Sequence, residues 1–281
     1  MDNITIAVTS GKGGTGKTTV ATNLACSINA PQFLDCDVED PNAHLFLNPV
    51  LQRTEPVLLP LPVVDYEKCI QCGKCVDFCE YNALALVKDK IIVFSELCHA
   101  CGGCSIVCPV DAISEQDRSI GIVEFGQAGD MKLIDGLLEI GEAVAPPIIK
   151  AVKSKSDKNL LTILDSPPGT GCPMVESING CDFALLVTEP TPFGLNDLAL
   201  ATEVVKKLEI PAGVVINRSD ENDAETEEYC KEQEIPVLMK IPMDRSIAEA
   251  YSEGKMLIDV KPKWKDKFNK LFDDIKRMLT E

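Results

Sequence analysis

The chain has 281 residues, of which 45% are hydrophobic, and this suffices for the core of one large α/β domain carrying an insertion. Its formal net charge of −17 argues against sequence-independent nucleic-acid binding, which needs clustered Lys and Arg to displace counterions. Because no apolar run approaches the length of a membrane span and the first residues read as a strand rather than a signal peptide, we expect a cytoplasmic protein and no membrane partner.

The first motif is a glycine-rich loop between a strand-like run, residues 4–9, and a helical run, residues 20–28. It fits the phosphate-loop pattern G-x-x-x-x-G-K-[ST], in which backbone N–H groups and a helix N-terminus bind a polyphosphate. Lys17 is placed to reach the β- and γ-phosphates, and Thr18 to ligate Mg²⁺. The expected nucleotide-binding residues are Gly11, Lys12, Gly13, Gly14, Thr15, Gly16, Lys17, Thr18 and Thr19.

A second lysine, Lys12, makes this loop resemble the deviant phosphate loop of the MinD/ParA/Mrp ATPases and of the nitrogenase iron protein. The resemblance implies an α/β fold with a doubly wound, mostly parallel sheet of the P-loop NTPase type (SIMIBI/MinD class) that binds ATP or ADP with Mg²⁺. In the resembled ATPases the extra lysine reaches across a dimer interface to the partner's nucleotide. The resemblance thus implies an ATP-dependent homodimer in which Lys12 and Lys17 are catalytic.

The next strand-like run, residues 32–35, leads into a pair of acids, Asp35 and Asp37. In the resembled family this strand ends in Asp-x-Asp, and the second acid orients the attacking water, which makes Asp37 the candidate for that role. Phosphoryl transfer to water depends on such in-line positioning of the nucleophile. The alternative is that Asp37 only caps the turn at residues 40–42. Three prolines within residues 55–62 then indicate an extended connector and a domain boundary.

Eight of the thirteen cysteines form two copies of the pattern C-x₂-C-x₂-C-x₃-C, an internal duplication. This is the pattern of bacterial ferredoxins with two [4Fe–4S] clusters, in which the fourth cysteine of each copy serves the other cluster. A pair of zinc sites is the alternative, and Glu80 departs from the pattern, which has Pro after the fourth cysteine. The expected ligands are Cys69, Cys72, Cys75 and Cys108 for one cluster, and Cys98, Cys101, Cys104 and Cys79 for the other.

The cysteine pattern and the phosphate loop together predict the domain organisation. We expect an inserted small α+β domain, like a bacterial ferredoxin, at residues 63–117. Residues 1–62 and 118–281 would form the two parts of the P-loop ATPase domain. Alternating apolar residues from 119 to 138 predict a β-hairpin that returns the chain to the main domain.

A buried strand-like run from residue 160 ends at Asp165 and is followed by Ser-Pro-Pro-Gly-Thr-Gly. It resembles the Walker B strand and switch II of the Mrp branch, which implies that Asp165 holds Mg²⁺ through water and that the N–H of Gly169 senses the γ-phosphate. Cys172 lies where the nitrogenase iron protein has a cluster-ligating cysteine in switch II. It is either a ligand of an interface cluster, a redox thiol or a small buried thiol.

Two further strand-like runs, residues 182–188 and 212–216, flank a helical run at residues 195–208. In the resembled family an Asn at the end of the second strand reads adenine and a later loop covers it. The implied adenine-binding residues are Asn217, Arg218, Pro242 and Asp244. An amide suits the adenine edge, although Asn217 also fits a simple turn. The helical period of residues 264–279 predicts a last helix packed on the sheet.

The leading functional hypothesis from the sequence is an ATPase in which a nucleotide-driven dimer switch gates electron transfer through two [4Fe–4S] clusters to a redox partner. One alternative is an iron–sulfur cluster carrier of the Mrp type that serves a cluster-accepting protein. The other is a regulatory or positioning ATPase like MinD, with structural or sensory clusters.

Overall fold

The structure is a computed structural model that describes residues 3–280. Nine strands form one sheet in the order β11-β10-β9-β1-β8-β2-β7-β6-β3. The strands from β11 to β7 pair in parallel, whereas β6 and β3 are antiparallel. The strand bounds are β1 (Thr5–Thr9), β2 (Gln32–Asp35), β3 (Val50–Val64), β6 (Ile113–Ala128), β7 (Met131–Leu138), β8 (Thr162–Asp165), β9 (Phe183–Thr188), β10 (Ala212–Ser219) and β11 (Val237–Pro242).

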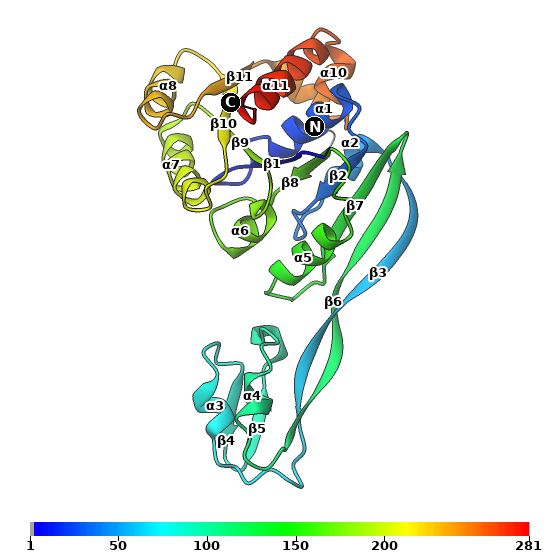
Figure 1. Ribbon diagram of the computed structural model, residues 1–281, viewed down its shortest axis with the longest axis vertical. Coiled ribbons are helices and arrows are strands. Elements are labelled where there is room, and N and C mark those ends of the chain that lie inside the picture. Colours follow the sequence, from blue (N-terminus) through cyan, green and yellow to red (C-terminus); the bar gives the residue numbers. More distant parts are fainter. Residues whose placement is uncertain (1–2, 281) are drawn as a thin grey trace.

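Helices cover both faces of the parallel part of the sheet (Figure 1), so the expected doubly wound architecture is confirmed. One apolar core lies beneath α1 (Lys17–Ser27), α10 (Leu257–Val260) and α11 (Trp264–Met278). The other lies beneath α5 (Pro146–Ser154), α6 (Cys172–Ile178), α7 (Pro192–Lys207) and α8 (Asp223–Glu232). Of two short helices, α2 (His44–Leu47) lies between β2 and β3, and α9 (Arg245–Ser252) lies between β11 and α10.

The last helix has the expected apolar stripe, and α11 packs beside α1 and β11. Trp264, Phe268, Leu271 and Ile275 follow one another at a spacing of about one helical turn, and all four are buried in the first core. The predicted packing of this helix on the main domain is therefore confirmed. Among residues 3–280, no helix is long and apolar enough to cross a membrane.

The two outermost strands form a long ribbon that leaves the sheet and carries a small lobe (Figure 1). Pairing of β6 with β7 covers Gly121–Ala128, whereas its pairing with β3 continues to Ile113. The lobe contains α3 (Lys74–Phe78), β4 (Leu84–Val87), β5 (Lys90–Val93) and α4 (Gly103–Ile106). Pro56, Pro60 and Pro62 fit β3 because it is an edge strand with a neighbour on one side only. The proline-rich segment is extended as expected, and it is a strand of the ribbon.

Candidate nucleotide site and cysteine-lined hollows

A pocket of about 300 Å³ lies over the N-terminus of α1, at the carboxyl edge of the parallel strands. The phosphate loop supplies part of its lining, and α1 directs its unpaired N–H groups into the same space. Asp37, Glu39, Asp40 and Asn42 face the loop from the segment after β2, and Pro167 and Pro168 from the segment after β8. The loop residues that line the pocket are Gly13, Gly14, Gly16, Lys17, Thr18 and Thr19.

Asp165 ends β8, is fully buried and lies against Thr18, which lines this pocket. One carboxylate oxygen accepts a hydrogen bond from Thr18 Oγ1 at 2.5 Å, and the other has no partner among the described residues. Burial raises the pKa of Asp165 to about 7, although Lys17 and the Thr18 hydroxyl oppose the rise. A buried carboxylate with an unused oxygen next to a threonine hydroxyl fits a Mg²⁺ ion, which prefers hard oxygen ligands. Thr18 and Asp165 would hold that ion.

The two acids after β2 have different environments. Asp35 is buried and accepts three backbone N–H bonds, from Asp37 at 3.1 Å, Asn42 at 3.2 Å and Ala43 at 3.1 Å. Asp37 lines the pocket, and burial raises its pKa to about 6 while Lys17 lowers it. Asp35 therefore shapes the segment, and Asp37 is the carboxylate that faces the phosphate space.

Lys12 does not line the phosphate pocket. Its ammonium forms an ion pair with Glu189 at 2.5 Å, and Arg218 pairs with the other oxygen of the same carboxylate at 2.8 Å. Glu189 was missed from the sequence, although it directly follows the buried strand β9 at the edge where ligands bind. The extra lysine of the loop is thus held within its own chain in this structure.

The implied adenine-binding residues lie outside the pocket. Asn217 donates its amide to Thr15 O at 2.8 Å, and a Cβ at Gly16 would come within 2.3 Å of that amide. Asp244 caps α9 by accepting from Ser246 N at 2.9 Å and forms an ion pair with Lys261. Pro242 ends β11 beside Ser219. In this structure Asn217 supports the phosphate loop, which has the positive φ of 91° at Gly16.

Gly169 and Cys172, which follow β8, also lie outside the lining of the phosphate pocket. The N–H of Gly169 donates to Ser10 O at 3.1 Å, so it is not directed at a γ-phosphate here. Cys172 begins α6 with an exposed side chain, which removes the buried-thiol alternative. Neither residue lines the pocket, whereas the adjacent Pro173 does.

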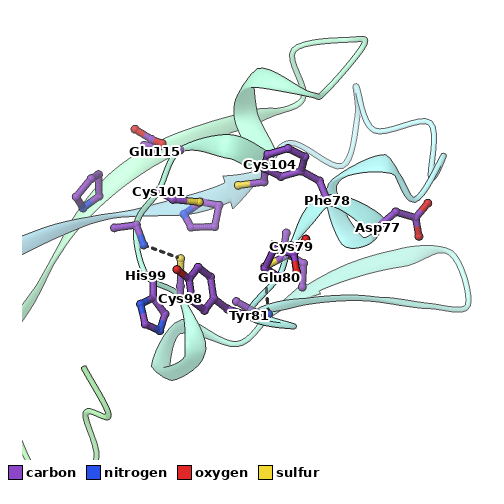
Figure 2. A pocket seen from close by; sticks show the side chains of 16 residues that line it. Asp77, Phe78, Cys79, Glu80, Tyr81, Cys98, His99, Cys101, Cys104 and Glu115 are labelled. Atoms are coloured by element: carbon purple, nitrogen blue, oxygen red, sulfur yellow. Dashed lines mark hydrogen bonds between the residues drawn. The ribbon is translucent and has the colours of Figure 1, made fainter. Parts of the chain in front are cut away.

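The eight cysteines of the repeat gather around two hollows of the lobe. One hollow is lined by Cys98, Cys101, Cys104 and Cys79, and Figure 2 shows these four side chains around it. The other is lined by Cys69, Cys72, Cys75 and Cys108. Each set therefore takes three cysteines from one copy of the repeat and the fourth from the other copy. All eight are free thiols.

Backbone geometry repeats with the cysteines. Left-handed residues occur at matching positions of the two copies, Gln71 and Ala100 at φ 53° and 51°, and Gly73 and Gly102 at φ 75° and 72°. These turns wrap the backbone around each hollow before the short helices α3 and α4 begin. The same duplication provides N–H donors to sulfur, from Ala83 to Cys79 at 3.4 Å and from Ala112 to Cys108 at 3.2 Å.

Each hollow presents four thiols to one space. A cubane cluster needs four thiolates around a space, and N–H bonds to sulfur are among the contacts that tune such clusters. The four-cysteine hollows fit that requirement.

The chain is similar to one described protein family and to several known proteins. The family described as "CobQ/CobB/MinD/ParA nucleotide binding domain" matches residues 6–258. An uncharacterized protein of Methanocaldococcus jannaschii is 34% identical over 261 residues, which are 90% of this chain and 91% of that protein. An iron-sulfur cluster carrier protein of Pyrococcus horikoshii is 26% identical over 274 residues, 89% of this chain and 77% of the carrier.

Two further similarities are to a solved structure and to a ferredoxin. The crystal structure of the cell division ATPase MinD of Pyrococcus furiosus has a TM-score of 0.58 at 23% identity, covering 98% of this chain and 99% of that one. An uncharacterized ferredoxin of M. jannaschii is 44% identical over 55 residues, 18% of this chain and 71% of the ferredoxin. The parallel sheet thus has the MinD-type fold, and the chain belongs to the CobQ/CobB/MinD/ParA family of P-loop ATPases.

Proposed function

We propose that this ATPase carries two [4Fe–4S] clusters in an inserted ferredoxin-like domain, residues 63–117, and that a nucleotide-driven dimer gates electron transfer through them to a redox protein. The observation that carries the proposal is the pair of four-cysteine hollows on a lobe joined to the phosphate-loop domain. The similarity to a ferredoxin over 55 residues supports the same domain.

The residues of the phosphate pocket support ATP hydrolysis, with residues 1–62 and 118–281 as the ATPase domain. Lys17 and the N–H groups of α1 would bind the phosphates, and Thr18 with Asp165 would hold Mg²⁺. Asp37 faces the same space and would accept a hydrogen bond from the attacking water. When bound, Mg²⁺ neutralises phosphate charge and the clusters exchange single electrons.

Lys12 is the residue from which we infer a dimer. The resemblance of the phosphate loop to that of the MinD-type ATPases implies an ATP-dependent homodimer. Lys12 is held by Glu189 of its own chain, so reaching a partner's nucleotide would require that this ion pair break. Glu189 is 13% exposed, and the exchange of one anionic partner for another would keep the lysine charge compensated.

The test is anaerobic reconstitution with iron and sulfide counting, followed by EPR of the reduced protein with and without Mg·ATP. We expect about eight irons per chain and a spectrum or reduction rate that changes with Mg·ATP. The matched control is Lys17→Ala, which should keep the irons and lose the response to nucleotide. Eight irons with no response in the parent protein would leave an ATPase with clusters but refute the gating.

The second candidate is an iron–sulfur cluster carrier, favoured by the 26% identity to the Pyrococcus horikoshii carrier protein. Of the cysteines outside the lobe, Cys172 is the exposed one, and no C-x-x-C pair occurs there. Incubation of the loaded protein with an apo-ferredoxin separates the two functions. Loss of iron from the chain with gain in the acceptor would support the carrier and overturn the electron-transfer proposal.

A further inference from the structure

A row of carboxylates crosses one face of the sheet, from the phosphate pocket toward the ribbon. Asp165 and Asp135 lie in register with Asp35 on either side of β2, and Glu124 of β6 lies directly opposite Asp135. Residues in register on neighbouring strands share one face of a sheet. Leu133, which precedes Asp135 on that face, belongs to the core beneath α1 and α11.

The acids of this row differ in their partners. Asp165 has the Thr18 hydroxyl, and Asp35 has three backbone N–H groups. Asp135 is 6% exposed, yet within residues 3–280 its carboxylate has neither an ion pair nor a hydrogen bond with another residue. Burial and then the charge of Glu124 raise the pKa of Asp135 to about 6. Two acids directly opposite each other on paired strands are destabilising unless something compensates their charge.

Both carboxylates face an open pocket of about 440 Å³, separate from the phosphate site. Leu51, Leu133 and Pro49 give it apolar walls. His44 and Asn48, both exposed, complete the lining from α2 and the turn after it. The pocket therefore combines one buried and one half-buried acid with apolar walls and two exposed polar side chains.

We propose that this pocket binds an organic cation, an ammonium or guanidinium group on an aliphatic stem, with Asp135 and Glu124 as its counter-charges. A cation at this position would form charge-assisted hydrogen bonds with a carboxylate that has no other partner. The apolar walls suit a methylene stem, in the way that lysine and arginine stems pack on apolar surface. A small amine and a basic side chain of a partner protein share this chemistry.

The position of the pocket links it to two other parts of the molecule. The segment 37–42, which lines the phosphate pocket, runs directly into α2, and α2 supplies His44. Leu51 is the second residue of β3, the strand that continues into the ribbon. An occupant would therefore contact both the segment that follows β2 toward the nucleotide and the start of β3, the strand that continues into the ribbon.

The experiment is calorimetric titration of the holoprotein with agmatine at pH 8 and 0.2 M salt, comparing the parent with Asp135→Asn and Glu124→Gln. We expect saturable one-to-one binding that weakens at least about tenfold in each variant, the size of one charge-assisted hydrogen bond. Asp130→Asn, an exposed acid in the adjacent turn, is the matched control and should bind as the parent does.

Two further measurements identify the source of the bound cation and test whether the variant is folded. A short acetylated Ala-Arg-Ala peptide that binds more tightly than agmatine would indicate a partner's side chain, and the reverse order a free amine. Asp135→Asn should keep or raise the thermal midpoint of the ligand-free protein, because it removes a buried unpaired charge. Absence of saturable binding by both probes, equal binding by Asp135→Asn, or displacement of agmatine by stoichiometric Ca²⁺ or Mn²⁺ would overturn the proposal.

Discussion

Replacing Asp165 with Asn should stabilise the nucleotide-free protein and remove most of its stabilisation by Mg·ADP. The pKa of Asp165 rises from 3.8 to about 7 on folding. Each pKa unit corresponds to about 1.4 kcal/mol, so ionised Asp165 costs the folded protein on the order of 4 kcal/mol at pH 8. An Asn side chain carries no charge and still accepts the bond from Thr18.

The sign of the pH dependence follows from the raised pKa. The folded state holds the proton more tightly, so stability falls as pH rises from about 4 through about 7. At pH 5.5 the parent protein has lost only part of this stability. The advantage of Asp165→Asn should therefore shrink to on the order of 2 kcal/mol there, about half its value at pH 8.

Urea unfolding measured by the fluorescence of Trp264 provides the assay, because this single tryptophan is buried between the last helix and the ATPase core. In the parent, Mg·ADP at a hundred times its dissociation constant should add about 3 kcal/mol, and Asp165→Asn should lose most of that gain. The control Asp130→Asn should change stability by less than about 0.5 kcal/mol. A nucleotide-free variant less stable than the parent at pH 8 would refute the cost assigned to the buried charge. A variant stabilised by Mg·ADP as much as the parent would refute the assignment of Asp165 to Mg²⁺.

Two further predictions concern the dimer and the lobe. Lys12→Ala should retain nucleotide binding but lose ATP-driven dimerisation and turnover, measured by light scattering and phosphate release; unchanged turnover would limit Lys12 to its ion pair with Glu189. Cys108→Ser should lower the iron content from about eight toward four, because it removes one thiolate from the second hollow, while Cys172→Ser should leave the count unchanged. Equal losses in both variants would contradict the separation of Cys172 from the clusters.

The parallel sheet was predictable because its signals are local. Each strand is an apolar run that ends in a chemically distinct residue, as at Asp35 and Asp165, and the helices follow with their own period. Strand pairing in register then brings these ends to one edge without further information. The cysteine sets also follow from spacing, since a duplicated pattern allows a fourth ligand from the other copy.

The roles of Lys12 and Asn217 could not be predicted, because each depends on a contact across the chain. Glu189 lies far from the phosphate loop in sequence, and its ion pair with Lys12 forms only after β9 is placed beside β1. Asn217 likewise meets Thr15 only through the order of strands. The length of the ribbon could not be predicted either, because three prolines indicate an extended segment but do not identify the strand that pairs with it.

The ribbon limits how nucleotide can influence the lobe. From Leu58 and Ser119 outward, β3 and β6 pair only with each other, and an isolated two-stranded ribbon is marginally stable by itself. Its base is fixed by Arg118, which forms a two-pronged ion pair with Glu142 at 2.5 and 2.7 Å. At the other end of β3, α2 joins the ribbon to the segment that faces the phosphates.

Nucleotide could therefore act on the lobe through α2 and the ribbon base within one chain, or by bringing the lobe against a partner protomer. Hydrogen exchange of residues 58–64 in Lys12→Ala distinguishes these routes, because this variant should bind nucleotide without dimerising. If Mg·ATP changes exchange there in the monomeric variant, the signal passes within the chain through the ribbon. If exchange changes only in the dimerising parent protein, the intrachain route is refuted and the contact between protomers carries the control.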